Sequence, residues 1–275
     1  MNQMHPRKKY WILGLVLGAA FCFGVSASAP LRAEENGIQT GLIELDGFKH
    51  PVYLFVPEGI SASERYPLII SIPDGGEDPK KHAEKWVEFG PYYQAIVLVP
   101  QYLRPEKLIA EPKSTDRWIF EIRDFVLSAW PANEHKVYLI GNGQSAAYAF
   151  YLGINYAPDF SAVALLGGSW MGETEKMLRL KSRSEEQIPI YVALHEAQAE
   201  LQKEVETGAM RFQEKGYWIE VRSFKDAEDF SKRSFRKTLM EWFDAKAEEW
   251  KRLADTRALT WYERLKRSVK EFFAV

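Results

Sequence analysis

The chain has 275 residues, of which 46% are apolar and 27% are charged, the balance of an ordinary globular protein. Four of the 36 basic residues and none of the 38 acidic residues lie in the first 33 positions, so the remainder carries a net charge of about −6. A mildly acidic body argues against nucleic acid as a partner. The single cysteine, Cys22, excludes an intramolecular disulfide.

Residues 1–33 have the pattern of a signal peptide or N-terminal anchor. Arg7, Lys8 and Lys9 precede the apolar run Trp11–Val25, and small residues follow at 26–29. The pattern predicts an exported protein, periplasmic or secreted. The run is shorter than the roughly 20 apolar residues of a full membrane span, but an uncleaved anchor with membrane association remains the alternative.

Residues 38–245 predict a single α/β domain. Near-continuous apolar runs, typical of strands buried on both faces, alternate with helical patterns. This alternation predicts a mostly parallel sheet, and Asp46-Gly47 marks a hairpin at its start, giving about eight strands. The expected strands are Gly41–Asp46, Val52–Val56, Pro67–Ile72, Ala95–Val99, Val137–Ile140, Ala162–Leu166, Ile190–Leu194 and Tyr217–Phe224, and the expected helices are Asp116–Trp130, Ala146–Leu152 and Glu200–Gly216.

Residues 246–275 predict an amphipathic C-terminal helix. Apolar residues from Trp250 to Phe272 recur at steps of one, three and four among charged positions. The helix either packs on its own domain or serves as a partner-binding or membrane-surface helix.

The stretch Val137–Leu152 reads VYLIGNGQSAAYAFYL. It resembles the nucleophile elbow of the α/β-hydrolases, in the carboxylesterase, acyl-protein thioesterase and polyhydroxybutyrate-depolymerase-like branch, whose members read G-F-S-Q-G-G-A after a strand. The resemblance implies an α/β-hydrolase fold, with a mostly parallel sheet of about eight strands flanked by helices, to which the apolar pattern after residue 245 adds the C-terminal helix. Gly143 stands where the family has its catalytic serine, and glycine keeps the strained turn without supplying a nucleophile.

The other two triad positions implied by the resemblance also differ. Members often read H-G-x-x-D after the strand that carries the acid, and here His195 matches the first residue while Ala199 falls at the acid. Glu196 or Glu200 could replace the acid only with a shifted loop. Glu228 occupies the family's histidine position, and no histidine follows His195. A carboxylate there cannot act as imidazole does near neutral pH.

The oxyanion loop is altered as well. Related proteins read H-G-G-G after the third strand, whereas this chain has Pro73-Asp74-Gly75-Gly76. The glycines can still offer backbone N–H groups, but an inward-pointing carboxylate would oppose developing negative charge. The expected cleft-lining residues are Pro73, Asp74, Gly75, Gln144, Ser145, Trp170 and His195.

Several of these residues have a second interpretation. Ser145 is either a nucleophile on an elbow shifted by two residues or a small polar residue in the first helical turn. Trp170 either lines the cleft or packs in the core. His82 and His195 with Glu196 suggest a metal, but without ligand spacing we expect ordinary histidines, no metal and no cofactor.

The pattern as a whole predicts an exported, catalytically inactive pseudo-hydrolase that acts by binding a small ligand or a protein. One alternative is an active carboxylesterase or lipase-like hydrolase with a rearranged site. Another is a structural interaction module that uses the C-terminal helix. Fold resemblance alone does not confer activity.

Overall fold

The computed structural model describes residues 37–102, 112–170, 173–180, 187–225, 230–249 and 252. The chain divides after Arg32 into two units, and all of these residues belong to the second. The predictions for residues 1–33, for Glu228 and for most of residues 246–275 lie outside the described residues and stay predictions. No helix within the described ranges is long and apolar enough to cross a membrane.

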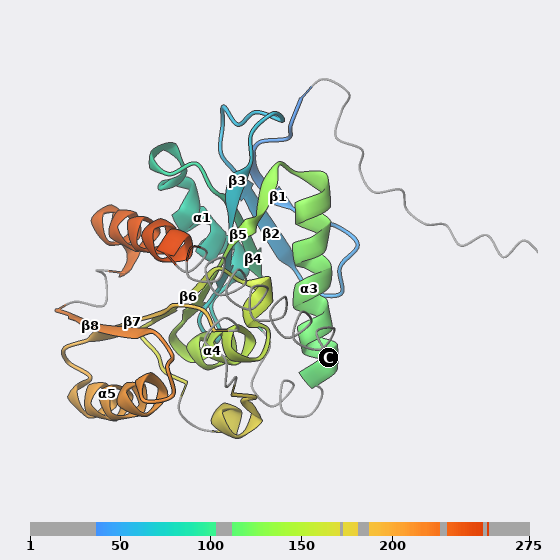
Figure 1. The fold of residues 1–275 in the computed structure, drawn as a ribbon. Coiled ribbons are helices and arrows are strands. Elements are labelled where there is room, and N and C mark those ends of the chain that lie inside the picture. The colour runs from blue at the N-terminus through green and yellow to red at the C-terminus, as the bar shows by residue number, and fades with distance from the viewer. Residues whose placement is uncertain are drawn as a thin grey trace, which may run out of the picture. The chain divides into compact units, whose positions relative to one another are not determined.

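An eight-stranded sheet forms the centre of the domain, in the order β1-β2-β4-β3-β5-β6-β7-β8 (Figure 1). Strand β2 pairs antiparallel with both β1 and β4, and every other pair is parallel. The predicted mostly parallel sheet of about eight strands, with an antiparallel pair at its start, is confirmed. The strands are β1 (Gly41–Glu44), β2 (Val52–Val56), β3 (Tyr66–Ile72), β4 (Ile96–Pro100), β5 (Ala132–Asn142), β6 (Ala162–Leu166), β7 (Ile190–His195) and β8 (Ile219–Phe224).

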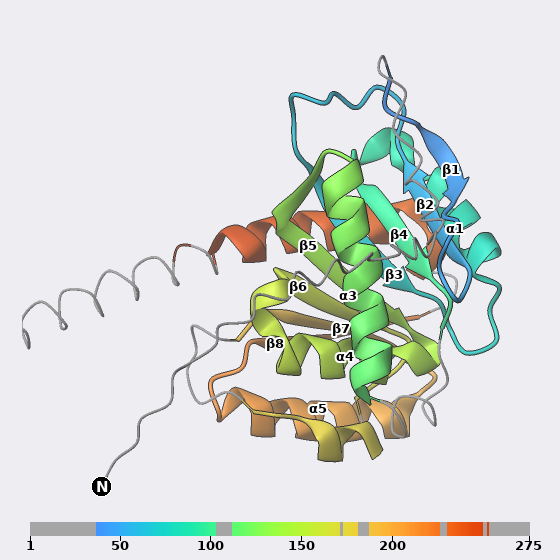
Figure 2. The ribbon, with the colours of Figure 1, turned by 90° about the vertical axis from the view of Figure 1, so that its right-hand side faces the viewer.

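Helices cover both faces of the sheet, as Figure 2 shows. Helices α3, α4 and α5 pack on one face, and α1 packs with the helix over residues 233–249 on the other. Strand β3 shows why both faces need cover, since Ile70 packs in the first layer and Ile69 in the second. The helices are α1 (Pro79–Val87), α3 (Pro112–Ala129), α4 (Ala146–Asn155) and α5 (Ala199–Gln213), with short 3-10 turns at Gly90–Tyr92, Gly143–Ser145, Ala157–Asp159 and Glu173–Met177.

Two helices have no counterpart among the predicted elements. Helix α1 begins with Asp78, whose Oδ1 accepts the Lys80 N–H at 2.7 Å, and has Pro79 in its first turn. The helix over residues 233–249 packs Phe243 on Tyr138 of β5 with ring centroids 4.6 Å apart. Both are needed to cover the second face of the sheet.

Two carboxylates fasten helices by binding tyrosine hydroxyls. On α3, Asp116 accepts from Tyr151 at 2.8 Å and from Tyr156 at 2.7 Å. Burial raises the pKa of Asp116, although these hydroxyls act in the opposite direction. On the other face, Asp244 accepts from Tyr138 of β5 at 2.9 Å. The two layers are thus held by polar contacts as well as by apolar packing.

Candidate functional site

The elbow lies where β5 ends at Asn142 and α4 begins at Ala146, with a 3-10 turn over Gly143–Ser145 between them. Gly143 has a φ of +52°, in the left-handed region that a glycine adopts without a Cβ clash. The turn has the strand–turn–helix form that α/β-hydrolases use to present a nucleophile. The sequence resemblance predicts the nucleophile position at Gly143, which has no side chain.

Contacts on both sides of the turn fix its shape. Ser145 Oγ accepts the Asn142 N–H at 2.7 Å and lies 2.9 Å from the Ile72 carbonyl oxygen on β3, to which it can donate. Gly141 lets the strand and helix approach closely, because a Cβ there would meet Ala146 Cα at 2.7 Å. These contacts explain why the sequence forms a sharp turn rather than a longer loop.

Asp74 from the loop after β3 covers this turn. Its Oδ1 accepts the Gly75 N–H at 2.6 Å and the Gln144 N–H at 2.7 Å. A Cβ built on Gly143 would overlap the Asp74 carboxylate. The carboxylate therefore occupies the space that a serine side chain would need.

The two N–H groups that hold Asp74 lie at the positions that the sequence resemblance predicts for an oxyanion hole. One belongs to the residue after the nucleophile position, Gln144, and the other to the loop after the third strand, Gly75. In a hydrolase these donors bind the negative oxygen of the tetrahedral intermediate. Here they bind a carboxylate of the same chain, as a charge-assisted pair of hydrogen bonds.

Three other residues that were expected to line the cleft are buried. Trp170 is 1% exposed and stacks on Phe150 at 4.7 Å, so it packs in the core and does not line a cleft. Pro73 is buried directly before Asp74. Ser145 is fully buried and its hydroxyl is engaged within the elbow, which agrees with a small polar residue in the first helical turn.

His195 ends β7 and is partly exposed. Its ring stacks on Phe230 with centroids 4.5 Å apart, and both rings approach Gly167. Its Nδ1 has no hydrogen-bond partner among the described residues. Ala199 is the exposed first residue of α5, so no carboxylate from position 199 accompanies this imidazole.

A cluster of three hydrogen-bonded polar side chains lies beneath α1, and the sequence did not predict that these residues meet. Ser71 Oγ lies 2.8 Å from His82 Nε2, and His82 Nδ1 lies 2.9 Å from Glu77 Oε2. This serine–imidazole–carboxylate order is the order of a hydrolytic triad. Ser71 is fully buried on a central strand and His82 is 4% exposed.

From the sequence, His82 was expected to be an ordinary loop or helix histidine, and only one weak signal indicated a buried polar network. Ser71 is the one polar residue in the apolar run of β3. A polar group at such a position needs a partner, because burial without a hydrogen bond is costly. That partner, His82, lies on α1, a helix that was not predicted from the sequence.

Neither histidine belongs to a metal cluster in the described part of the chain. No group of three or more His, Cys, Asp or Glu side chains there is arranged to hold an ion. The nitrogens of His82 are engaged by Ser71 and Glu77, which are hydrogen-bond partners of a core imidazole.

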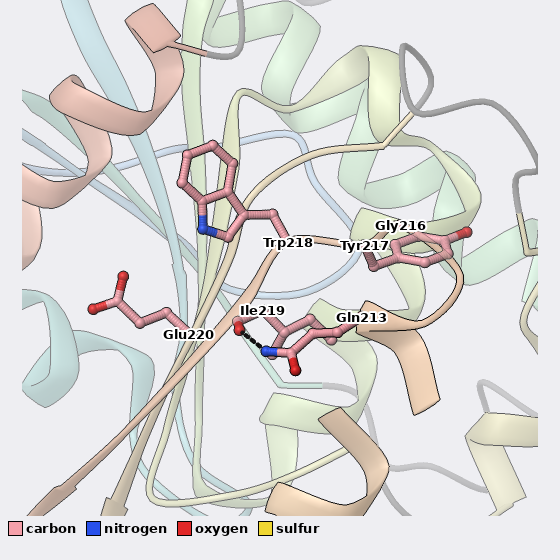
Figure 3. A pocket seen from close by; sticks show the side chains of 6 residues that line it. All are labelled: Gln213, Gly216, Tyr217, Trp218, Ile219 and Glu220. Atoms are coloured by element: carbon pink, nitrogen blue, oxygen red, sulfur yellow. Dashed lines mark hydrogen bonds between the residues drawn. The ribbon is translucent and has the colours of Figure 1, made fainter. Parts of the chain in front are cut away.

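A shallow hollow of about 500 Å³ lies at the start of β8, far along the strand from its carboxyl end (Figure 3). Ligands of open α/β sheets bind at the carboxyl ends of the strands, where the elbow lies. The polar groups of the hollow are bound by the protein itself: Gln213 Nε2 donates to the Ile219 carbonyl at 2.8 Å, and the Glu220 carboxylate accepts from Arg222 and Trp242. The hollow is lined by Gln213, Gly216, Tyr217, Trp218, Ile219 and Glu220.

No family model matches the sequence, and no curated protein matches it. Solved structures match in fold. S-formylglutathione hydrolase FrmB from Staphylococcus aureus aligns with a TM-score of 0.57 at 11% identity, over 75% of this chain and 99% of that one. The HSL-homolog EstE7 from a metagenome library gives 0.55 at 14% identity, over 78% and 88%. A thermostable esterase gives 0.52 at 17% identity, over 67% of this chain and 54% of that one. At these identities the likeness shows the fold, which is that of the α/β-hydrolases.

Proposed function

We propose that this chain, an α/β-hydrolase-fold protein of esterase-like architecture, acts by binding a ligand or a protein and does not hydrolyse esters. One observation carries the proposal: the Asp74 carboxylate sits on the Gly75 and Gln144 N–H groups. A hydrolase keeps those donors free for the oxyanion. A fixed carboxylate in their place repels the charge that ester attack would develop there.

The nucleophile side of the site supports the same proposal. Gly143 offers no hydroxyl, and Ser145 is buried with its hydroxyl bound inside the elbow. To act as a nucleophile, Ser145 would need a base within hydrogen-bond reach. Its hydroxyl instead bonds to the backbone of Asn142 and Ile72.

Labelling with a fluorophosphonate probe, which reacts with activated serines, tests this proposal. The purified full chain should not label, and hydrolysis of a short-chain p-nitrophenyl ester should match buffer. An esterase of known activity in the same assay is the positive control. Stoichiometric labelling of any serine would contradict the proposal.

An active hydrolase with a rearranged site is the second candidate. The structures of similar fold are named as esterases and hydrolases, and Ser71, His82 and Glu77 stand in triad order. Burial argues against Ser71 as a nucleophile, because its side chain is fully enclosed. Mapping a labelled peptide would separate the two forms of this candidate, since label on Ser145 indicates a shifted elbow and label on Ser71 an opened network.

We further propose that the chain works outside the cytoplasm, periplasmic or secreted. The support is the basic flank and apolar run within residues 1–33. Fractionation of cells that express a C-terminally tagged chain tests it. Recovery of soluble cytoplasmic protein with an intact N-terminus would rule out export.

A further inference from the structure

The Glu77 carboxylate is the junction between the Asp74 loop and the buried network under α1. Its Oε2 accepts the His82 Nδ1–H at 2.9 Å and the Asp74 N–H at 3.3 Å. Its Oε1 accepts from the Lys85 ammonium at 2.5 Å. Its own backbone N–H donates to the Asp74 carbonyl at 3.0 Å. The backbone of Asp74 is therefore held by Glu77 through two hydrogen bonds.

The far end of this junction is anchored in the sheet. A carboxylate can only accept, so His82 Nδ1 carries a proton and donates to Glu77, and His82 Nε2 lies 2.8 Å from the Ser71 hydroxyl. Both side chains are buried, and a fully satisfied buried polar network is rigid. Glu77 is thus fixed to β3 and α1 rather than free in solvent.

The near end is an exposed side chain in an unusual place. Asp74 is exposed, yet its Oδ1 reaches across to the Gln144 N–H on a different element. Gly76, with a φ of +87°, lets the chain turn back so that Glu77 faces Asp74. An exposed carboxylate would otherwise be solvated and mobile, so its backbone must be held for the contact to persist.

We infer that Glu77 and His82 are positioning residues that hold the Asp74 carboxylate on the Gly75 and Gln144 N–H groups. The inference rests on the closed site of the proposed function and adds what keeps it closed. It assigns the triad-ordered network a role that needs no access for a substrate, in agreement with the complete burial of Ser71.

Hydrogen exchange of the Gln144 amide, followed by NMR on the full chain, tests the inference. Gln144 is hydrogen-bonded to Asp74, and none of its contacts is with Glu77. In Asp74→Ala and in Glu77→Ala the Gln144 N–H should exchange about tenfold faster than in the wild type. The double variant should exchange no faster than Asp74→Ala alone, because both changes act through one contact.

Two controls separate positioning from a general loss of structure. The Asn142 N–H, which Ser145 Oγ accepts within the same elbow, should keep its wild-type rate. Glu84→Ala removes an exposed carboxylate from α1, the helix that carries His82, and should leave Gln144 unchanged. If Glu77→Ala also speeds exchange of the Asn142 N–H, the isosteric variant Glu77→Gln replaces it in the test. In Glu77→Gln the Gln144 N–H should exchange faster than in the wild type, by less than in Glu77→Ala, and the Asn142 N–H should keep its wild-type rate.

The outcomes distinguish this inference from the proposed function. A wild-type rate at Gln144 in the Glu77 variant, together with a raised rate in Asp74→Ala, overturns the positioning role alone. An unchanged rate in Asp74→Ala overturns the contact on which both rest. Failure of the proposed function by itself would appear as labelling of a serine, with the exchange pattern intact.

Discussion

The elbow and the network under α1 each resemble one half of a hydrolytic site. The elbow on β5 retains the turn and the pair of N–H donors at the carboxyl edge of the sheet, but Gly143 supplies no nucleophile. The network on β3 has serine, imidazole and carboxylate in the right order, but Ser71 is fully enclosed. Neither the N–H donors of the elbow nor the serine–imidazole–carboxylate network suffices alone, because hydrolysis needs both around one accessible nucleophile.

The two regions also differ in what satisfies their polar groups. The Gln144 donor lies in the turn that leads into α4, where unpaired N–H groups attract an anion, and the Gly75 donor lies in the loop after β3. Asp74 provides that anion from within the chain. The network satisfies itself internally, with Lys85 closing its outer end at Glu77. Both arrangements therefore stabilise the folded chain without a ligand.

The largest effect should come from breaking the buried network at its centre. His82→Ala removes the 2.8 Å contact of Ser71, which retains a long 3.5 Å contact from Asn142 Nδ2, and it leaves the half-buried Glu77 with one partner fewer. The expected loss is about 3 kcal/mol in free energy of unfolding, or a melting temperature lower by about 6–10 °C. Thermal denaturation followed by circular dichroism measures it, with His135→Ala, at an exposed histidine, as the matched control. A melting temperature within about 1 °C of the wild type would show that the network contributes little.

A smaller effect should appear in acid. Burial raises the pKa of Glu77, but the hydrogen bonds and charges of His82 and Lys85 outweigh it and hold the pKa at about 2, against an ordinary 4.5. Because the folded pKa lies below the unfolded one, the stability from Glu77 is fully present above pH 4.5 and is lost as the pH falls towards 2. Its side chain is 21% exposed, so we expect about 2 kcal/mol rather than the full linkage value.

Urea unfolding at several pH values between 6 and about 2.5 measures this contribution. Glu77→Gln should flatten the acid-induced loss by that amount, whereas Glu84→Gln, at an exposed carboxylate on the neighbouring helix α1, should leave the curve unchanged. Parallel curves for the wild type and Glu77→Gln would mean that other carboxylates cause the acid sensitivity.

The sheet was predictable because its signals are local. The runs Val52–Val56 and Ala162–Leu166 match β2 and β6 residue for residue, since an apolar run buried on both faces is defined by its own composition. Helix α1 was not predicted, although Asp78-Pro79 is a start signal, because the helix has only nine residues and few of them are apolar. The elbow turn was anticipated from Gly143, which is also a local property.

The contacts of the site were not predictable in the same way. Asp74 was expected to oppose negative charge if it pointed inward, but its position on the Gln144 N–H depends on residues 70 positions apart. The Ser71–His82 contact depends on a helix packed over a strand. For Trp170 both a cleft-lining and a core position were open, and its stacking on Phe150 shows that it packs in the core. Such contacts follow from packing between elements, which a single sequence does not encode locally.

The smallest effect on stability concerns the elbow itself. Gly143→Ser should lower the free energy of unfolding by about 1–2 kcal/mol, because serine is strained at a φ of +52° and its Cβ would displace the Asp74 carboxylate.

The Gly143→Ser variant should still not hydrolyse a short-chain p-nitrophenyl ester, since a serine hydroxyl needs a positioned base and the base needs an orienting partner. The same assay on Gly143→Ser with Ala199→Asp and Glu228→His, with and without Asp74→Gly, shows which loss is limiting. Because triad members act as a unit, turnover should require the complete set, and activity only after Asp74 is also removed would identify its carboxylate as the remaining block. Turnover by Gly143→Ser alone would mean that a working base, of which His195 is the partly exposed candidate, already reaches the elbow, and the comparison between an inert elbow and an enclosed relay would then be wrong.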